Sequence, residues 1–331
     1  MRIGFLERTA LARPLREAGF RLWDIGARGG IDPHFAPFAF SIDAVGFEPD
    51  PAAFRLLVPS GRWRSERFFE TAIAGTTGPG ILNIPEDPAG ASLLEHDPAV
   101  GDRYGLGALF DVRHRLAIDT RTMDDAVRTL GVPPPNLLKL DVEGLELAIL
   151  EGGLPQLGGV VAVKLEAAFL RHRRNQPLVG DLVAFMEVQG FCLMDIVDQA
   201  RWRTRPWAAD PYVVKRDPAY SRGRLVQADL VFLREPDTVT ASTAFSAALA
   251  AMGLGYFDHG LELLAAAGDA DGGERRAEDI RKAVPQAARA YGRARARAEL
   301  RGLPMHAVRL VRSLAGGLNA PPGTDAGRKV G

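Results

Sequence analysis

The chain has 331 residues, of which 47% are hydrophobic and 25% charged, and this composition is typical of a globular protein and excludes a disordered or fibrous one. Forty-one lysines and arginines balance forty-one aspartates and glutamates, so we expect no specific nucleic-acid partner from net charge alone. The single cysteine, Cys192, excludes an internal disulfide, and the spacing of the six histidines disfavours a structural zinc site.

Residues 1–20 are expected to form an N-terminal helix. They lack the apolar core and the small-residue cleavage site of a secretion signal. No stretch of about 18 uncharged apolar residues occurs in the chain, so no transmembrane segment is expected. These features predict a cytoplasmic protein.

Short apolar and β-branched runs, separated by Gly, Pro and Asp, recur through the first 236 residues. Several are apolar throughout, which is typical of parallel strands covered by helices on both faces. The expected strands span residues 21–25, 42–47, 67–73, 137–141, 160–166, 191–197 and 226–233. Helical patterns lie between them, at residues 122–130, 143–151 and 176–189. This alternation predicts an α/β fold with a doubly wound, Rossmann-like sheet of seven strands, in a domain over residues 21–236.

Residues 76–117 depart from that alternation, because they carry Gly, Pro, Asp and His without sustained periodicity. A short strand is expected only at residues 81–84. Long irregular insertions in compact domains usually act as lids or binding loops. We therefore expect an insertion over one edge of the sheet.

The composition changes to Ala, Leu and Arg after Pro236 and predicts a helical extension over residues 237–315. Helices are expected at 245–267, 274–301 and about 305–314, followed by a disordered tail at 316–331. From Glu274 to Arg312 there are eleven basic residues and four acidic ones. A solvated helix face or a subunit contact, which would make a homo-oligomer, is favoured over contact with an anionic glycan, a lipid headgroup or nucleic acid.

The first expected strand leads into a glycine-rich turn, because residues 23–30 read WDIGARGG. Such a turn lets the backbone approach a ligand closely. Its spacing lacks the G-x-G-x-x-G dinucleotide fingerprint, which disfavours a dehydrogenase or epimerase. Twenty-four residues beyond Asp24, Glu48 follows the second strand, where it is placed to accept hydrogen bonds from both hydroxyls of a ribose. Together the turn and Glu48 predict a nucleoside ligand.

Acidic residues follow the fourth expected strand, where residues 139–146 read KLDVEGLE. Asp141 lies at the carboxyl edge of the sheet, in reach of the same crevice, although it also suits the N-cap of the next helix. Glu143 and Glu146 complement the positive end of that helix, and this simpler role is favoured for Glu146.

Taken together, these segments resemble the FkbM-type family of S-adenosylmethionine-dependent methyltransferases over about residues 20–235. The resemblance rests on residues 24–30, 46–50, 139–153, 176–195 and 227–234. Its most specific part is the string K-x-D-V-E-G-x-E-x-x-x-L-x-G that starts at Lys139. The family's first loop usually reads D-x-G-A-N-x-G, and here Arg28 replaces the Asn. Arg28 is therefore expected to meet the methionine carboxylate or to pair with a neighbouring acid.

The resemblance implies S-adenosylmethionine as the cofactor. The implied contacts to its methionine end come from the first turn and from Asp141, and the turn contributes Asp24, Gly26, Ala27, Arg28 and Gly30. Glu48 would hold the ribose, and the adenine would lie near Phe47 and residues 72–74, which include Ala72. The implied activity is methylation of a hydroxyl on a sugar or polyketide-like small molecule or glycan.

Methyl transfer from a sulfonium needs an aligned acceptor and no covalent enzyme intermediate. A hydroxyl acceptor must also lose its proton, and the candidates to take it are Asp141, Glu143, Glu166 at the tip of the fifth strand, and His172. Asp141 and Glu166 could instead hold Mg²⁺, and sequence spacing leaves that choice open. Another alternative is a non-catalytic module that binds the cofactor and docks a partner through its basic C-terminal helices.

Overall fold

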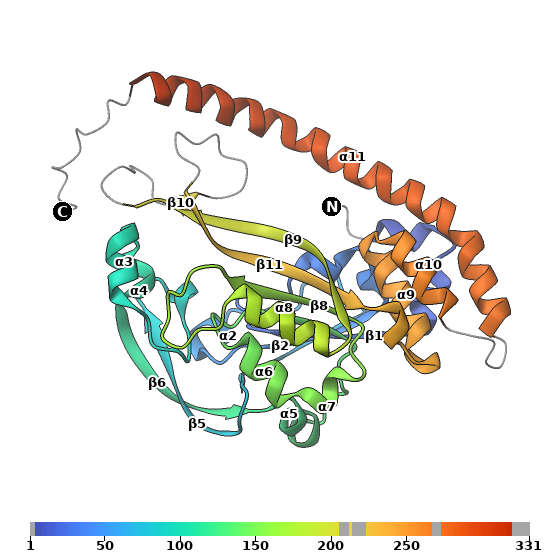
Figure 1. Ribbon diagram of the computed structural model, residues 1–331, viewed down its shortest axis with the longest axis horizontal. Coiled ribbons are helices and arrows are strands. Elements are labelled where there is room, and N and C mark those ends of the chain that lie inside the picture. Colours follow the sequence, from blue (N-terminus) through green and yellow to red (C-terminus); the bar gives the residue numbers. More distant parts are fainter. Residues whose placement is uncertain (1–3, 205–211, 214–222, 267–272, 320–331) are drawn as a thin grey trace.

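The computed structural model describes residues 4–204, 212–213, 223–266 and 273–319 (Figure 1). Its main sheet has the order β10-β9-β11-β8-β7-β1-β2-β3. Neighbouring strands are parallel from β8 to β3, whereas β11 is antiparallel to both β8 and β9, and β10 is antiparallel to β9. The strands are β1 Phe20–Ile25, β2 Ile42–Phe47, β3 Ser65–Phe69, β7 Leu137–Leu140, β8 Ala162–Ala168, β9 Phe191–Trp202, β10 Tyr212–Val213 and β11 Arg224–Arg234. All seven predicted strands contribute to this sheet, and the two-residue β10 extends its edge.

Two buried cores lie on opposite faces of the sheet. Neighbouring residues of one strand point to opposite faces, and accordingly Leu22 belongs to one core and Trp23 to the other. The same division separates Leu137 from Leu138 on β7. The fold is therefore a doubly wound α/β sheet, as predicted.

Each face is covered by its own set of helices. The core that contains Leu22 also takes residues from α1 Ala12–Ala18, η2 Pro33–Ser41, α9 Ala241–Leu254, α10 Phe257–Ala265 and α11 Gly273–Asn319. The opposite core takes residues from α5 Met123–Leu130, α6 Glu146–Gly152, α7 Leu154–Leu157 and α8 Val179–Val188. The expected N-terminal helix is divided into η1 Phe5–Arg8 and α1, and two short elements, α2 Pro51–Phe54 and η4 Pro236–Thr238, complete this part of the fold.

The segment expected as an irregular insertion forms a second, three-stranded sheet with the order β4-β6-β5. The strands β5 and β6 pair along most of their length in antiparallel register. The elements of this region are β4 Ala72–Ile73, β5 Gly78–Pro85, η3 Pro88–Gly90, α3 Pro98–Tyr104, α4 Gly107–Phe110 and β6 Val112–Arg121. The predicted third strand is thus shared between β3 of the main sheet and β4 of the small one.

The C-terminal helices differ from the predicted ones in their boundaries. Gly255, at φ 100°, ends α9 in a left-handed conformation, and it separates α9 from α10 where one helix was expected. The helix α11 runs continuously over Gly273–Asn319, through the break expected near residues 302–304. Its Ala, Leu and Arg residues have high helix propensity, which outweighs the single glycine and proline there. Residues 316–319 of the expected tail are therefore helical, and the remainder of that tail lies outside the described residues.

The first part of α11 packs on the body of the protein through Ile280, Val284 and Ala287. The rest of this long helix extends across the top of Figure 1. Among the helices of the described ranges, none combines the length and apolar character that a membrane crossing needs.

Candidate functional site

A cavity of about 490 Å³ lies at the carboxyl ends of β1, β2 and β7. Its walls come from the turn after β1, from Phe47 and Glu48, from the loop after β7, and from residues 88–93. This volume is in the range of small-molecule sites, which is roughly 300–1,000 Å³. Open α/β sheets bind their ligands at this edge, so the cavity is where the sequence places a ligand.

The glycine turn brings two strand ends into direct backbone contact. Gly26 has φ 85°, and a Cβ built there would lie 1.9 Å from the carbonyl oxygen of Asp141. Gly29 and Gly30 also have left-handed backbones, but an added Cβ at either would meet no described atom within 4 Å. Close approach therefore requires a glycine at position 26, and the other two allow the turn to bend around the cavity.

Asp24 and Ala27 are not among the residues that line the cavity, and their expected contact with a ligand stays a prediction. The Asp24 carboxylate accepts a hydrogen bond of 2.7 Å from the backbone N–H of Asp32, and its Oδ1 lies 3.0 Å from Lys139 Nζ. Burial raises the pKa of Asp24, and the Lys139 ammonium opposes this rise. The methyl group of Ala27 would lie 2.8 Å from a Cβ added to Gly46. Both side chains thus pack against the turn and help to fix its conformation.

Glu48 is only 4% exposed and lines the cavity. Its Oε1 accepts a hydrogen bond of 2.9 Å from the backbone N–H of Asp50, and burial raises its pKa. Arg28 also lines the cavity, and its guanidinium is 2.7 Å from the carboxylate of Asp50. Of the two partners expected for Arg28, the structure therefore has the neighbouring acid. Phe47 and Ala72 form part of the apolar wall.

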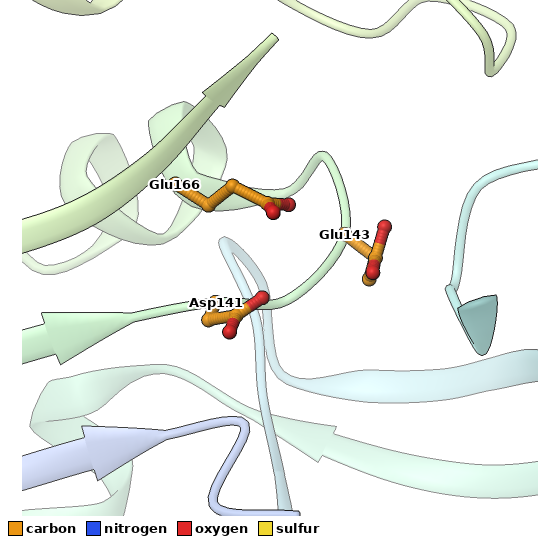
Figure 2. A group of neighbouring side chains, drawn as sticks. All are labelled: Asp141, Glu143 and Glu166. Atoms are coloured by element: carbon orange, nitrogen blue, oxygen red, sulfur yellow. The ribbon is translucent and has the colours of Figure 1, made fainter. Parts of the chain in front are cut away.

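Asp141, Glu143 and Glu166 line the cavity and form a carboxylate cluster (Figure 2). One oxygen from each side chain lies within 4.8 Å of the others. Asp141 directly follows β7, Glu143 lies two residues later with the unusual φ of 59°, and Glu166 comes from β8. A left-handed backbone is strained for a glutamate, and such strain is often stored at functional sites. All three cluster residues were candidates from sequence.

Two of the three carboxylates face a cationic side chain. Lys139 Nζ lies 3.6 Å from Asp141 Oδ2, and the Arg173 guanidinium forms an ion pair with Glu143. Within the described ranges, Glu166 has no ion-pair partner. Burial raises the pKa of Glu166 well above its usual range, and the negative charges of Glu143 and Asp141 raise it further. Burial also raises the pKa of Glu143, but Arg173 opposes this.

Glu146 has a structural role, as favoured from the sequence, but not through the helix dipole alone. Its carboxylate accepts hydrogen bonds from the backbone N–H groups of Val142, at 3.0 Å, and Gly144, at 3.2 Å. It thereby holds the loop that carries Asp141 and Glu143. Burial raises the pKa of Glu146 to about 7. The helix α6 begins at Glu146 with Leu145 as its N-cap, so the alternative N-cap role of Asp141 is wrong.

His172 lies apart from the cavity lining. Its Nδ1 is 2.9 Å from the carbonyl oxygen of Leu170, and its ring packs against Phe110 and Trp202. The side chain is 2% exposed, and burial with the adjacent Arg173 lowers its pKa to about 3. This environment favours a packing role over that of a general base.

Sequence reasoning assigned no role to the buried cations of this region. Lys139 donates a hydrogen bond of 2.8 Å to the Gly26 carbonyl, which fixes the glycine turn on β7. Lys164 lies 2.8 Å from Asp32 and 2.9 Å from Asp229. A lysine within an otherwise apolar strand is itself a signal, because a buried charge needs a partner. Arg173 gave no comparable signal, since it stands among other arginines in a loop.

A doubly wound sheet with a glycine turn after β1 and a buried acid after β2 defines the class of Rossmann-like α/β proteins whose cavity suits a nucleoside ligand. Within that class, the chain belongs to the Methyltransferase FkbM domain family, whose model matches residues 24–193, or 170 of the 331 residues.

One curated relative is the hexuronic acid methyltransferase AglP of Haloferax volcanii. It is 26% identical over 145 residues, which cover 44% of this chain and 54% of the relative. The chain thus matches about half the length of that protein. Family membership supports methyltransferase activity.

Solved methyltransferase structures also match, at low similarity. The methyltransferase FkbM of Methylobacillus flagellatus gives a TM-score of 0.35 at 13% identity, covering 65% of this chain and 44% of that one. A TehB-like SAM-dependent methyltransferase of Corynebacterium glutamicum gives 0.29 at 10% identity, with coverage of 69% and 89%. The precorrin-6y C5,15-methyltransferase of Geobacter metallireducens gives 0.31 at 12% identity, with coverage of 68% and 86%.

Proposed function

We propose that this protein is an S-adenosylmethionine-dependent methyltransferase that methylates a hydroxyl oxygen of a sugar or polyketide-like acceptor. The observation that carries the proposal is the convergence of the glycine turn, Glu48 and the carboxylate cluster on one cavity. Family membership supports the methyl-transfer chemistry and disfavours the alternative of a dehydrogenase or epimerase. The curated relative is named for a hexuronic acid, which supports a sugar acceptor.

Several residues that line the cavity suit a sulfonium nucleoside. The turn from Gly26 to Gly30 leaves space where a side chain would intrude, and Glu48 offers a buried carboxylate to the two hydroxyls of a ribose. Phe47 and Ala72 offer an apolar surface to the base. S-adenosylmethionine supplies a methyl group on a positively charged sulfur. The task of the protein is to align the acceptor with that group and to exclude water.

The carboxylate cluster suits the other requirement, which is removal of the hydroxyl proton. When several carboxylates lie close together, their mutual repulsion raises the pKa of some of them. A carboxylate with a raised pKa is a better base near neutral pH than an ordinary exposed carboxylate. Asp141 and Glu166 line the cavity and are the proposed proton acceptors, with Glu143 beside them. His172 is left out of this proposal because it does not line the cavity.

The cluster does not fit the Mg²⁺ alternative well. Lys139 and the Arg173 guanidinium already stand against Asp141 and Glu143, which are two of the three oxygen donors that a hard cation would use. A divalent cation would have to compete with both side chains. We therefore derive no step through a metal and assign proton transfer to the cluster.

Calorimetry with S-adenosylmethionine and S-adenosylhomocysteine tests the proposal. The wild-type protein should bind both, whereas a nicotinamide dinucleotide should not bind. Glu48→Gln should weaken binding by about 10- to 150-fold, since loss of a charged hydrogen bond amounts to about 1.5–3 kcal/mol.

Glu70→Gln is the matched control for that variant, because Glu70 is an exposed acid just after β3, and it should leave affinity unchanged. Absence of binding by the wild-type protein would refute the proposal, and unchanged affinity in Glu48→Gln would refute the ribose assignment. Binding without turnover on any hydroxyl acceptor would favour the non-catalytic module.

A further inference from the structure

Arg173 joins three segments that are distant in the sequence. It lies in the loop after β8, where it forms an antiparallel bridge with His96 of the insertion. The residue is only 4% exposed. Its guanidinium pairs with the Glu143 carboxylate and donates a hydrogen bond of 3.3 Å to the carbonyl oxygen of Gly90. Arg173 therefore connects the rim of the cavity to the carboxylate cluster.

The position of Glu143 depends on these contacts. Its backbone is left-handed, and its carbonyl oxygen accepts a hydrogen bond of 2.8 Å from Ser92 of the insertion. The backbone is thus held from one side and the carboxylate from the other. A neutral side chain at position 173 would leave the Glu143 carboxylate buried without a cation.

Glu166 is in the opposite situation, since acidic groups face it from each neighbouring element. Asp141 and Glu143 approach from the loop after β7, and Glu146 from α6. Asp229 is its direct partner in the β8–β11 register, and the Asp229 carboxylate is itself occupied by Lys164. Carboxylates this close cannot all be ionised unless cations compensate them. Among the residues that the structure describes, a cation compensates Asp141 and Glu143, and none forms an ion pair with Glu166.

We infer that Arg173 is a positioning residue that keeps Glu143 as a permanent carboxylate, so that Glu166 is the member of the cluster that loses and regains a proton during methyl transfer. This inference rests on the proposed function. With no added positive charge in the cavity, Glu166 is protonated. When a sulfonium ligand adds one positive charge, Glu166 releases its proton to water.

The proton and charge balance of methyl transfer then closes on Glu166. The bond between the acceptor oxygen and the methyl carbon forms as the bond between sulfur and that carbon breaks, and the electron pair stays on sulfur. The Glu166 carboxylate takes the hydroxyl proton. One positive charge on sulfur and one negative charge on Glu166 are thus replaced by a neutral thioether and a neutral carboxylic acid.

Proton release on ligand binding tests this inference without any acceptor. Calorimetric titrations at neutral pH, in two buffers of different ionisation enthalpy, give the number of protons released. The wild-type protein should release about one proton more with S-adenosylmethionine than with S-adenosylhomocysteine. Glu166→Gln should bind both ligands and abolish the difference.

Arg173 is tested by the same measurement. In Arg173→Gln, Glu143 should also hold a proton and compete with Glu166, so the difference between the two ligands should depart from the wild-type value, and Arg173→Lys should restore it. Arg174→Gln is the matched control, because Arg174 is adjacent but exposed and pairs with the exposed Glu95. It should behave as the wild type does.

The outcomes separate the two proposals. If neither ligand binds, the proposed function fails and this inference fails with it. If both bind with equal proton release, or if Glu166→Gln keeps the difference, only the role of Glu166 is overturned. The role of Arg173 would be overturned if Arg173→Gln folds, as judged by circular dichroism, and behaves like Arg174→Gln. If Arg173→Gln does not fold, the test is made with Arg173→Lys. A difference between the two ligands in Arg173→Lys that departs from the wild-type value would then overturn the role of Arg173.

Discussion

Gly26→Ala should damage the protein far more than the same change three residues away. A Cβ at position 26 would lie 1.9 Å from the carbonyl oxygen of Asp141 and 2.9 Å from its carbonyl carbon. Both are backbone atoms and cannot rotate away, so either β1 and β7 must separate or the turn must unwind. Gly29→Ala has a similar left-handed backbone, at φ 82°, but its Cβ would meet no described atom within 4 Å.

The difference between the two variants follows from these distances. A left-handed backbone costs an alanine about 1–2 kcal/mol, and this term applies to both variants. Overpacking adds about 1–3 kcal/mol, and it applies to Gly26→Ala alone. We therefore expect Gly26→Ala to lower the free energy of unfolding by about 2–5 kcal/mol, and Gly29→Ala to lower it by about 1–2 kcal/mol.

Urea-induced unfolding, followed by circular dichroism, measures both losses on proteins prepared in parallel. Calorimetry with S-adenosylhomocysteine should give the same order, with affinity falling more in Gly26→Ala, because this variant moves the loop that carries Asp141. Equal destabilisation by the two variants would refute the contact between Gly26 and Asp141, and with it the account of how the turn is held against β7.

Two further predictions concern the loop after β7. Asp141→Asn should keep the fold and lower turnover, and wild-type turnover should survive removal of divalent cations by a chelator. A fully active Asp141→Asn variant would show that Asp141 takes no part in proton transfer. Glu146 has a folded-state pKa of about 7, above the ordinary 4.5, so its stabilising effect is complete below pH 4.5 and is lost as the pH rises through 7. Between pH 4.5 and 7, the free energy of unfolding of the wild type should therefore fall by about 3 kcal/mol because of this group. Glu146→Gln should remove this fall, as measured by urea unfolding at the two pH values. An unchanged pH dependence in the variant would contradict the assignment.

The main sheet could be predicted from the sequence because its strands are buried on both faces. The residues of β7 are all buried, and all of them except Lys139 are apolar, as is typical of such a strand. The small sheet gave no such signal. In β6, the sequence VRHRLAIDTR has only one buried residue, Thr120, so its polar residues hide the strand. Pairing with β5, a long-range contact, decides its structure.

The candidate site was predictable where a residue directly follows a strand. Glu48 and Asp141 follow β2 and β7, and parallel strands place such residues at one edge of a sheet. Asp24 lies within β1, and sequence alone does not reveal that the turn folds back over it. The roles of Lys139 and Arg173 depend on contacts to distant segments, which no local pattern encodes.

The strand register gives a reason to expect that the cavity favours a cationic ligand. Lys139 lies beside Asp24 on β1 and beside Lys164 on β8, so two buried lysines stand next to each other, and Lys139 lines the cavity. Each lies close to more than one acid, with Asp24 and Asp141 near Lys139, and Asp32 and Asp229 near Lys164.

Two lysines therefore face four acids, before Glu48 and Glu166 are added. Protonation of buried carboxyl groups removes part of the excess negative charge, and a positively charged ligand can remove the rest. A sulfonium nucleoside meets this requirement while its methyl group is in place and loses the charge after transfer. Its neutral product should be held less tightly by electrostatics, which favours release once the methyl group has been passed on.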